Sequence, residues 1–107
     1  MAITSTGTSA AEMARVASGA HKDDAASPAA ITLTLGFTPR YVKMVNVTTI
    51  QVQEWFEGLG VADAFKTVNS ASAQFSLILT GGITVSGGTV TMPAPAQNDQ
   101  IYWIAHG

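Results

Sequence analysis

The sequence contains no cysteine, which excludes disulfide bonds, thiol catalysis and zinc sites built from cysteine. No stretch approaches the ~20 consecutive apolar residues that a membrane-spanning helix requires. The N-terminal segment MAITSTGTSAAEMARV has neither the basic start nor the apolar middle of a signal peptide. We therefore expect a protein that is made and used without secretion and that has no membrane partner.

Charged residues are also scarce, at 11% of the chain, against about 25% in a typical soluble domain. The net charge is −2 and the five lysines and arginines are scattered, so they form no basic stripe of the kind that binds nucleic acid. Hydrophobic residues make up 47% of the chain. Either alanine inflates this share in an ordinary monomer, or part of the surface is covered in an assembly.

The segment QVQEWFEG, residues 51–58, places two glutamates around a tryptophan-phenylalanine pair. Such a set could indicate glycoside hydrolysis, which requires two carboxyl groups that converge at about 5–10 Å. In a regular strand, however, Glu54 and Glu57 point to opposite faces, because side chains alternate. The spacing also favours neither Asp63 nor Asp99 as a partner. We therefore expect no catalytic residue in this segment.

The same alternation sends Trp55 and Phe56 to different faces of the strand, so we expect packing residues rather than a catalytic platform. Glu54 shares a face with Phe56, which places a charge beside an apolar side chain. Because an unpaired buried carboxylate is costly, we expect Glu54 either to reach solvent or to pair with Arg40 or Lys43.

Other motifs of enzymes and cofactor sites are missing as well. His21 and His106 stand at opposite ends of the chain, and neither has a second ligand at metal-binding spacing. Residues 58–60, GLG, are half of a dinucleotide fingerprint, but the third glycine is replaced and no long helix is predicted after them. Residues 81–88, GGITVSGG, contain no lysine for a phosphate loop and are typical of tight turns. We expect no enzyme, no cofactor and no metal.

Short apolar alternations separated by glycine and proline predict an all-β fold, a single β-sandwich or jelly-roll-like domain with an extended N-terminal arm. The arm covers residues 1–29, which are rich in small polar side chains, and the sandwich covers residues 30–107. Within the arm, residues 10–17 could form two helical turns, or residues 14–20 a short strand. The arm is either a frayed terminus or an extension that orders on a neighbour. Strands are predicted for residues 31–35, 41–47, 50–57, 64–68, 73–80, 83–85, 89–92 and 100–105.

Two of the predicted strands have apolar side chains on both faces. Both faces of residues 41–47 are largely apolar, and in residues 100–105 Tyr102 and Trp103 point to opposite sides. A two-layer sandwich needs only one buried face per strand. The second apolar face must therefore lie under a loop, under the N-terminal arm or against another subunit.

The segment LGFTPRYVKMVNVT, residues 35–48, resembles a strand-turn-strand of small structural proteins of tailed bacteriophages. Residues 54–58 (EWFEG), 81–85 (GGITV) and 101–103 (IYW) fit the same pattern, so that the resemblance covers residues 30–107. It is closest to capsid decoration (cement) proteins, which are small β-sandwich or jelly-roll proteins and commonly trimeric. The Gly-Phe-x-Pro-x-x-Val element within it also resembles strands of phage tail-fibre modules.

The resemblance implies a non-enzymatic structural protein of the bacteriophage virion, made in the host cytoplasm and located on the capsid surface. It would bind the major capsid protein from outside and stabilise the shell as a homo-oligomer, for which we expect a homotrimer. Individually weak contacts suffice, because a trimer engages several capsid subunits at once. We expect the subunit or capsid interface to draw on apolar and aromatic residues from Tyr41, Met44, Trp55, Phe56, Tyr102, Trp103 and Ile104.

Two alternatives stay open. One is a tail-fibre or receptor-binding module that recognises a host glycan, and the other is an unrelated lectin-like domain that binds glycan as a monomer through Trp55 or Trp103. A fibre module is also expected to be trimeric, so stoichiometry does not separate it from a capsid protein. Fibre modules usually end long chains, whereas we expect the 107 residues of this chain to be the complete protein, which favours the capsid.

Overall fold

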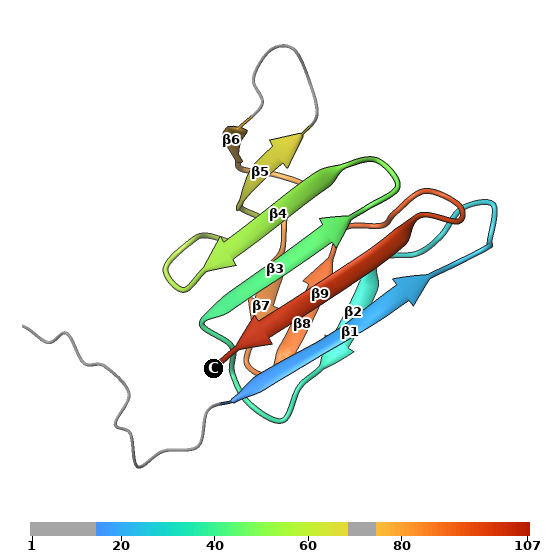
Figure 1. Cartoon of the computed structure of the whole chain (residues 1–107). Helices are drawn as coiled ribbons and strands as arrows, with labels where there is room; N and C mark the ends of the chain where they lie inside the picture. The colour runs from blue at the N-terminus through green and yellow to red at the C-terminus, as the bar shows by residue number, and fades with distance from the viewer. Residues whose placement is uncertain (1–14, 69–74) are drawn as a thin grey trace, which may run out of the picture.

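The chain forms two antiparallel sheets in a computed structural model that describes residues 15–68 and 75–107 (Figure 1). These described residues contain nine strands and no helix, which confirms the predicted all-β fold. The strands are β1 (Val16–Lys22), β2 (Ile31–Thr34), β3 (Tyr41–Asn46), β4 (Gln51–Phe56), β5 (Ala64–Val68), β6 (Phe75–Ile78), β7 (Thr84–Ser86), β8 (Thr89–Met92) and β9 (Gln100–His106).

The larger sheet has six strands in the order β1-β9-β3-β4-β5-β6, and the smaller sheet has three in the order β2-β8-β7. In Figure 1 the smaller sheet lies behind β3, β9 and β1 of the larger one, so the two sheets form two layers. Strands β3 to β6 are neighbours in sequence as well as in space. The two ends of the described chain meet in the β1–β9 pair.

The core lies between the two sheets and takes alternate side chains from their strands. In β3 burial alternates from residue to residue, with Val42 and Met44 buried and Tyr41 and Lys43 less so. The inner face of the larger sheet is therefore the side that carries Val42 and Met44. The core cluster draws on both sheets and consists of Ile31, Val42, Met44, Trp55, Ile83, Val90, Met92, Ile101 and Ala105.

The hairpin between β7 and β8 shows how the glycine pairs act. Ser86 pairs with Thr89, which leaves Gly87 and Gly88 as a two-residue loop. Gly87 has a φ of 58°, in the left-handed region that such tight hairpin turns require. The predicted turn at this position is confirmed.

The predicted strands agree with the observed ones to within one residue at each end, apart from residues 73–80. At its C-terminal end that strand is two residues shorter than predicted, because β6 ends at Ile78. Residues 73 and 74 lie outside the described residues.

Strand β1 lies within the N-terminal arm predicted for residues 1–29. Val16–Lys22 lies within residues 1–29 and pairs with β9 over its whole length, so this strand belongs to the sandwich. Two alternatives were predicted for this segment, a strand over residues 14–20 and a helix over residues 10–17. The predicted strand overlaps β1, and residues 16 and 17 of the predicted helix are in β1 instead. Residues 1–14, which include most of the predicted arm, lie outside the described residues.

A glycine in β1 makes room for a large side chain of β9. Gly19 lies directly opposite Trp103. A Cβ atom at position 19 would approach three atoms of the Trp103 indole to between 2.8 and 3.0 Å, closer than ordinary contacts between carbon atoms. The indole therefore covers the backbone of β1, and glycine is the residue that permits this.

Candidate interaction surface

The outer face of the larger sheet is the side that points away from the smaller sheet, and the strand register defines it. Residues directly opposite each other in neighbouring strands share a face. Lys43 is opposite Ile104 on one side and Glu54 on the other, and Glu54 is in turn opposite Phe65. Continued across β9, β3, β4, β5 and β6, this register places on the outer face His106, Ile104, Tyr102, Tyr41, Lys43, Val45, Phe56, Glu54, Val52, Phe65, Leu77 and Phe75.

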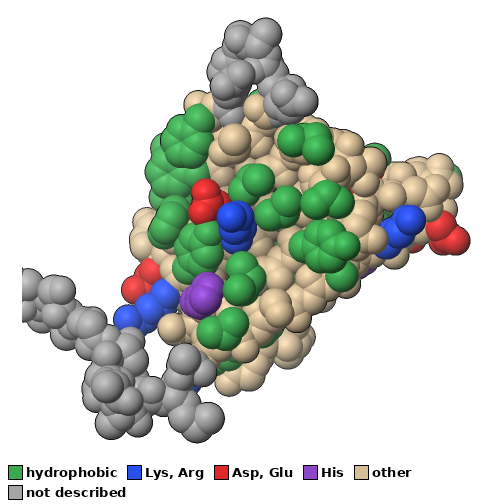
Figure 2. Space-filling view, viewed as in Figure 1, with side chains coloured by type: hydrophobic (Ala, Val, Ile, Leu, Met, Phe, Trp, Pro, Cys, Tyr) green, Lys and Arg blue, Asp and Glu red, His purple; other side chains and the backbone are tan. Residues whose placement is uncertain are grey.

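Large apolar side chains on this face are exposed. Phe56 is 44% exposed, Phe75 63%, Leu77 50% and Tyr102 50%. Figure 2 looks onto the outer face and shows apolar side chains spread over β3, β4 and β9, with few charged ones among them. Single exposed hydrophobic residues are ordinary, but a contiguous patch marks an interaction site.

Four rings, one from each of β3 to β6, form an aromatic row across the outer face. The ring centroids of Tyr41 and Phe56 are 5.2 Å apart, those of Phe56 and Phe65 6.0 Å, and those of Phe65 and Phe75 5.6 Å. The last two rings are nearly parallel, with an angle of 7° between their planes. Such pairs stabilise one another beyond simple burial. The aromatic row, defined as Tyr41, Phe56, Phe65 and Phe75, is thus a fixed feature of the surface.

Glu54 is held within this apolar surface by a tyrosine. The Tyr41 hydroxyl donates a hydrogen bond to Glu54 Oε2 over 2.6 Å, and the pair is half-buried. Burial raises the pKa of Tyr41 to about 12, with smaller contributions from this hydrogen bond and from the negative charge of Glu54. The sequence predicted solvent, Arg40 or Lys43 as the partner of Glu54. The observed partner is a hydroxyl group, while Lys43 lies directly opposite on the same face.

The residues predicted for an interface divide between the two faces of the sheet. Met44 and Trp55 are core residues, 6% and 7% exposed, and Trp103 packs against the core from the inner face. These three side chains therefore do not contribute to the outer face. The other four do, namely Tyr41, Phe56, Tyr102 and Ile104.

Two members of the aromatic row, Phe65 and Phe75, were missed by the sequence reasoning. Each is the one aromatic residue of its strand, so neither strand shows an aromatic pattern by itself. The only available signal is that Phe65 alternates with Lys66 and so must lie on the opposite face. Placing Phe65 beside Phe56 further requires the register of β5 on β4, which local spacing does not reveal.

A shallow hollow lies on the outer face, on the other side of Lys43 from the aromatic row. It has a volume of about 180 Å³ and is lined by Lys43, Val45, Tyr102 and Ile104, together with Trp103, which lies between Tyr102 and Ile104 in β9 and has its side chain on the inner face. Its walls are mostly apolar side chains of β3 and β9. The outer face therefore combines the aromatic row, in which Phe56 and Phe75 are exposed, with a hollow that could receive an apolar group.

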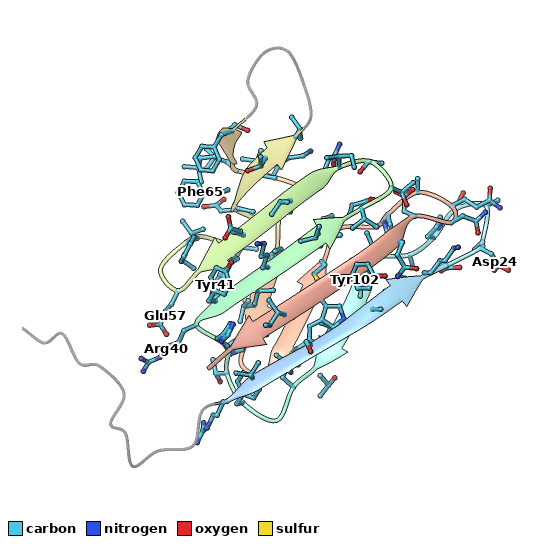
Figure 3. The ribbon with its side chains drawn as sticks, in the orientation of Figure 1. Asp24, Arg40, Tyr41, Glu57, Phe65 and Tyr102 are labelled. Carbon is cyan, nitrogen blue, oxygen red and sulfur yellow. The ribbon has the colours of Figure 1, made fainter. Side chains whose placement is uncertain are left out.

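Of the other carboxylates considered for glycoside hydrolysis, Glu57 lies outside the strand that carries Glu54, and Asp63 and Asp99 have hydrogen-bond partners. Glu57 follows the end of β4, and its backbone N–H donates to the carbonyl of Arg40 over 2.9 Å at the rim of the sheet (Figure 3). Asp63 accepts a hydrogen bond from a backbone N–H of its own turn. Asp99 is buried and accepts one from Asn46 Nδ2 over 2.8 Å. Both aspartates thus fix the shape of loops.

Within residues 15–68 and 75–107, no three histidine, aspartate or glutamate side chains are grouped so that they could hold a metal ion. In the same residues, no helix has the length and apolar character that crossing a membrane demands. No family model, curated protein or solved structure matches the chain.

Proposed function

We propose that this chain is a non-enzymatic structural protein of a bacteriophage virion, a capsid decoration protein that forms a homotrimer and binds the outer surface of the major capsid protein. The observation that supports this proposal best is the exposed apolar outer face with its aromatic row. The resemblance of residues 30–107 to small phage virion proteins supports it as well.

An exposed apolar face of this kind is stabilised by contact with another protein. Burial of apolar surface contributes roughly 25 cal/mol per Å², and a specific interface covers about 800 Å² on each partner. The low share of charged residues, 11%, also leaves little to keep a lone monomer dispersed. In a protein that binds other subunits this apolar surface is buried in the interface, whereas in a free monomer it stays exposed to water.

The outer face offers two different apolar regions, which suits a ring. In a cyclic trimer, a patch on one subunit meets a different patch on the next, and the rotation closes after three copies. Phe75, at the edge strand β6, is 63% exposed. The hollow beside Tyr102, with a volume of about 180 Å³, could accept an aromatic ring from a neighbour. We assign Phe75 of one copy to the hollow of the next.

The assembly is tested by the mass in solution, measured by light scattering at micromolar protein concentration. The expected result is a species three times the 11.1 kDa mass of the chain. Phe75→Ser and Tyr102→Ser should each shift the species toward the monomer. The matched control is Val61→Ser, because Val61 is 78% exposed and lies between β4 and β5, outside the strands that form the outer face. A wild-type monomer would reject the homotrimer.

The location is tested by an electron microscopy map of intact virions in which this protein carries a fused tag. Tag density distributed over the shell supports a decoration protein. Tag density confined to the tail assigns the chain to a fibre instead and overturns the proposal. Glycan binding through Trp55 or Trp103 gains no support, because Trp55 is 7% exposed and the indole of Trp103 covers Gly19.

A further inference from the structure

A polar notch opens on the inner face of the larger sheet, where the smaller sheet ends. Figure 1 shows that β5 and β6 extend past the strands of the smaller sheet. One row of directly opposed residues runs across the inner face in the order Trp103, Met44, Gln53 and Lys66. The row changes from apolar to polar as it leaves the cover of the smaller sheet. The notch that begins there has a volume of about 180 Å³.

The walls of this notch combine polar side chains with an apolar support. Lys66, Gln51 and Gln53 line it from β4 and β5, and Met44 and Pro95 lie among its apolar residues. Of the described residues that line it, Lys66 alone is charged. A ligand in the notch would therefore meet one positive charge, the three side-chain amides of Asn46, Gln51 and Gln53, and an apolar wall.

Gln53 supplies an independent sign that a ligand belongs here. It is 9% exposed, and its Oε1 is buried without a hydrogen-bond partner among the described residues. A buried acceptor without a donor costs free energy that a bound donor recovers. Gln53 is among the residues that line the notch, and the last torsion of a glutamine side chain is broad and roughly two-fold, so rotation about this torsion can present the oxygen to a bound ligand. Gln53 can therefore accept a hydrogen bond from a ligand in the same notch in which Lys66 can pair with an anion.

We propose that the notch binds a small monocarboxylate that carries hydroxyl groups, such as a sugar acid. Its carboxylate pairs with the Lys66 ammonium, and a neighbouring hydroxyl donates to Gln53 Oε1. The amide of Gln51 can both donate and accept, as a second hydroxyl does. The volume is below the range of about 300–1,000 Å³ for sites of drug-sized ligands, which limits the ligand to a single ring or its open-chain equivalent. This inference is independent of the proposed place in the virion.

The test is an NMR titration of the ¹⁵N-labelled full chain with sodium D-glucuronate at constant ionic strength. Addition up to about 50 mM covers a site with a millimolar dissociation constant. The expected result is saturable shifts at the side-chain amides of Gln51 and Gln53 and at the backbone amide of Gly81, which also lines the notch. D-glucose lacks the carboxylate and acetate lacks the hydroxyls, so each should bind at least about tenfold more weakly.

Two variants and a matched control make the assignment specific. Lys66→Gln removes the charge and should raise the dissociation constant about tenfold or more, since a charge-assisted hydrogen bond is lost. Gln53→Leu removes the buried acceptor and should abolish saturable binding while the chain stays folded. Lys22→Gln removes an exposed charge from β1, on the far side of the sheet, and should leave binding unchanged. Shifts that do not saturate, or equal binding by the Lys66 and Lys22 variants, would overturn the proposal.

Discussion

Replacing Gly19 by alanine tests how the two ends of the sandwich fit together. The new Cβ atom would lie 2.8, 2.9 and 3.0 Å from three atoms of the Trp103 indole, whereas carbon atoms in contact are normally about 3.5–4.0 Å apart. The indole is rigid and packs against the core, so it cannot simply turn away. Either Trp103 or strand β1 must shift.

The magnitude follows from two opposing effects. Inserting a methyl group into packed structure costs about 1–3 kcal/mol. Alanine also restricts the unfolded chain, which stabilises the fold by about 0.4–1 kcal/mol. The net loss in the free energy of unfolding should therefore be about 1–2 kcal/mol, the middle of the range that these two effects allow. At roughly 4–8 °C per kcal/mol, the melting temperature should fall by roughly 4–16 °C.

The assay is denaturant unfolding followed by tryptophan fluorescence, at one protein concentration for all variants. Gly36→Ala is the matched control, because a Cβ atom at position 36 meets no atom within 4 Å. It should be stabilised by a few tenths of a kcal/mol to about 1 kcal/mol. In the background Trp103→Leu, the penalty of Gly19→Ala should largely disappear. If the Gly19 and Gly36 variants prove equally stable, the indole does not cover β1 and the reasoning is refuted.

Three further predictions concern other parts of the fold. The pKa of Tyr41 is raised from 10.0 to about 12, so its contribution to stability is present below about pH 10 and is lost as the pH rises toward 12. The absorbance of tyrosinate should show that Tyr41 deprotonates at this high pH. Tyr41→Phe should remove the transition, and Glu54→Gln should move it to lower pH. Asn46→Ala should lower the free energy of unfolding by about 2–3 kcal/mol, because it breaks the 2.8 Å hydrogen bond to buried Asp99 and two hydrogen bonds from backbone N–H groups of the next turn. A loss below about 1 kcal/mol in a denaturant titration would contradict this prediction. Gly82→Ala should prevent native folding as judged by NMR dispersion, since its Cβ would lie 2.6 Å from a backbone carbonyl oxygen in a neighbouring turn; a well-dispersed native spectrum is the contrary outcome.

Most strands were predictable because each one shows its own alternation and ends at a glycine, a proline or a polar turn. Alternation also separated Tyr102 from Trp103 and Trp55 from Phe56, since it needs only neighbouring residues. Strand β1 lacked this signal, because its sequence VASGAHK contains small and polar residues. Gly19 must be small to fit under Trp103, yet these two residues are far apart in the chain. The packing of β1 was therefore invisible to local reasoning.

The direction of each face was beyond the sequence for a related reason. In β4, Val52 and Phe56 form the more apolar side, which a simple reading would turn toward the core. The structure instead turns Gln51 and Gln53 inward, together with Trp55. The inward side is set by where the smaller sheet packs, so the side of β4 that carries the glutamines faces inward, where Gln53 is buried. Because β4 turns its glutamines inward, its more apolar side lies on the outer face and its polar side lines the notch.

Glu54 and Lys43, the acidic and the basic side chain near the middle of the outer face, are compatible with an apolar interface. A carboxylate buried without a partner would cost several kcal/mol in an apolar interface. Glu54 already accepts a hydrogen bond from Tyr41, and Lys43 lies opposite it on the neighbouring strand. The two charges sum to zero within one subunit, so a neighbour that covers the face need not supply a charge of its own. An apolar group can therefore dock beside them, and the pair limits docking to partners that leave its oxygen and nitrogen atoms satisfied.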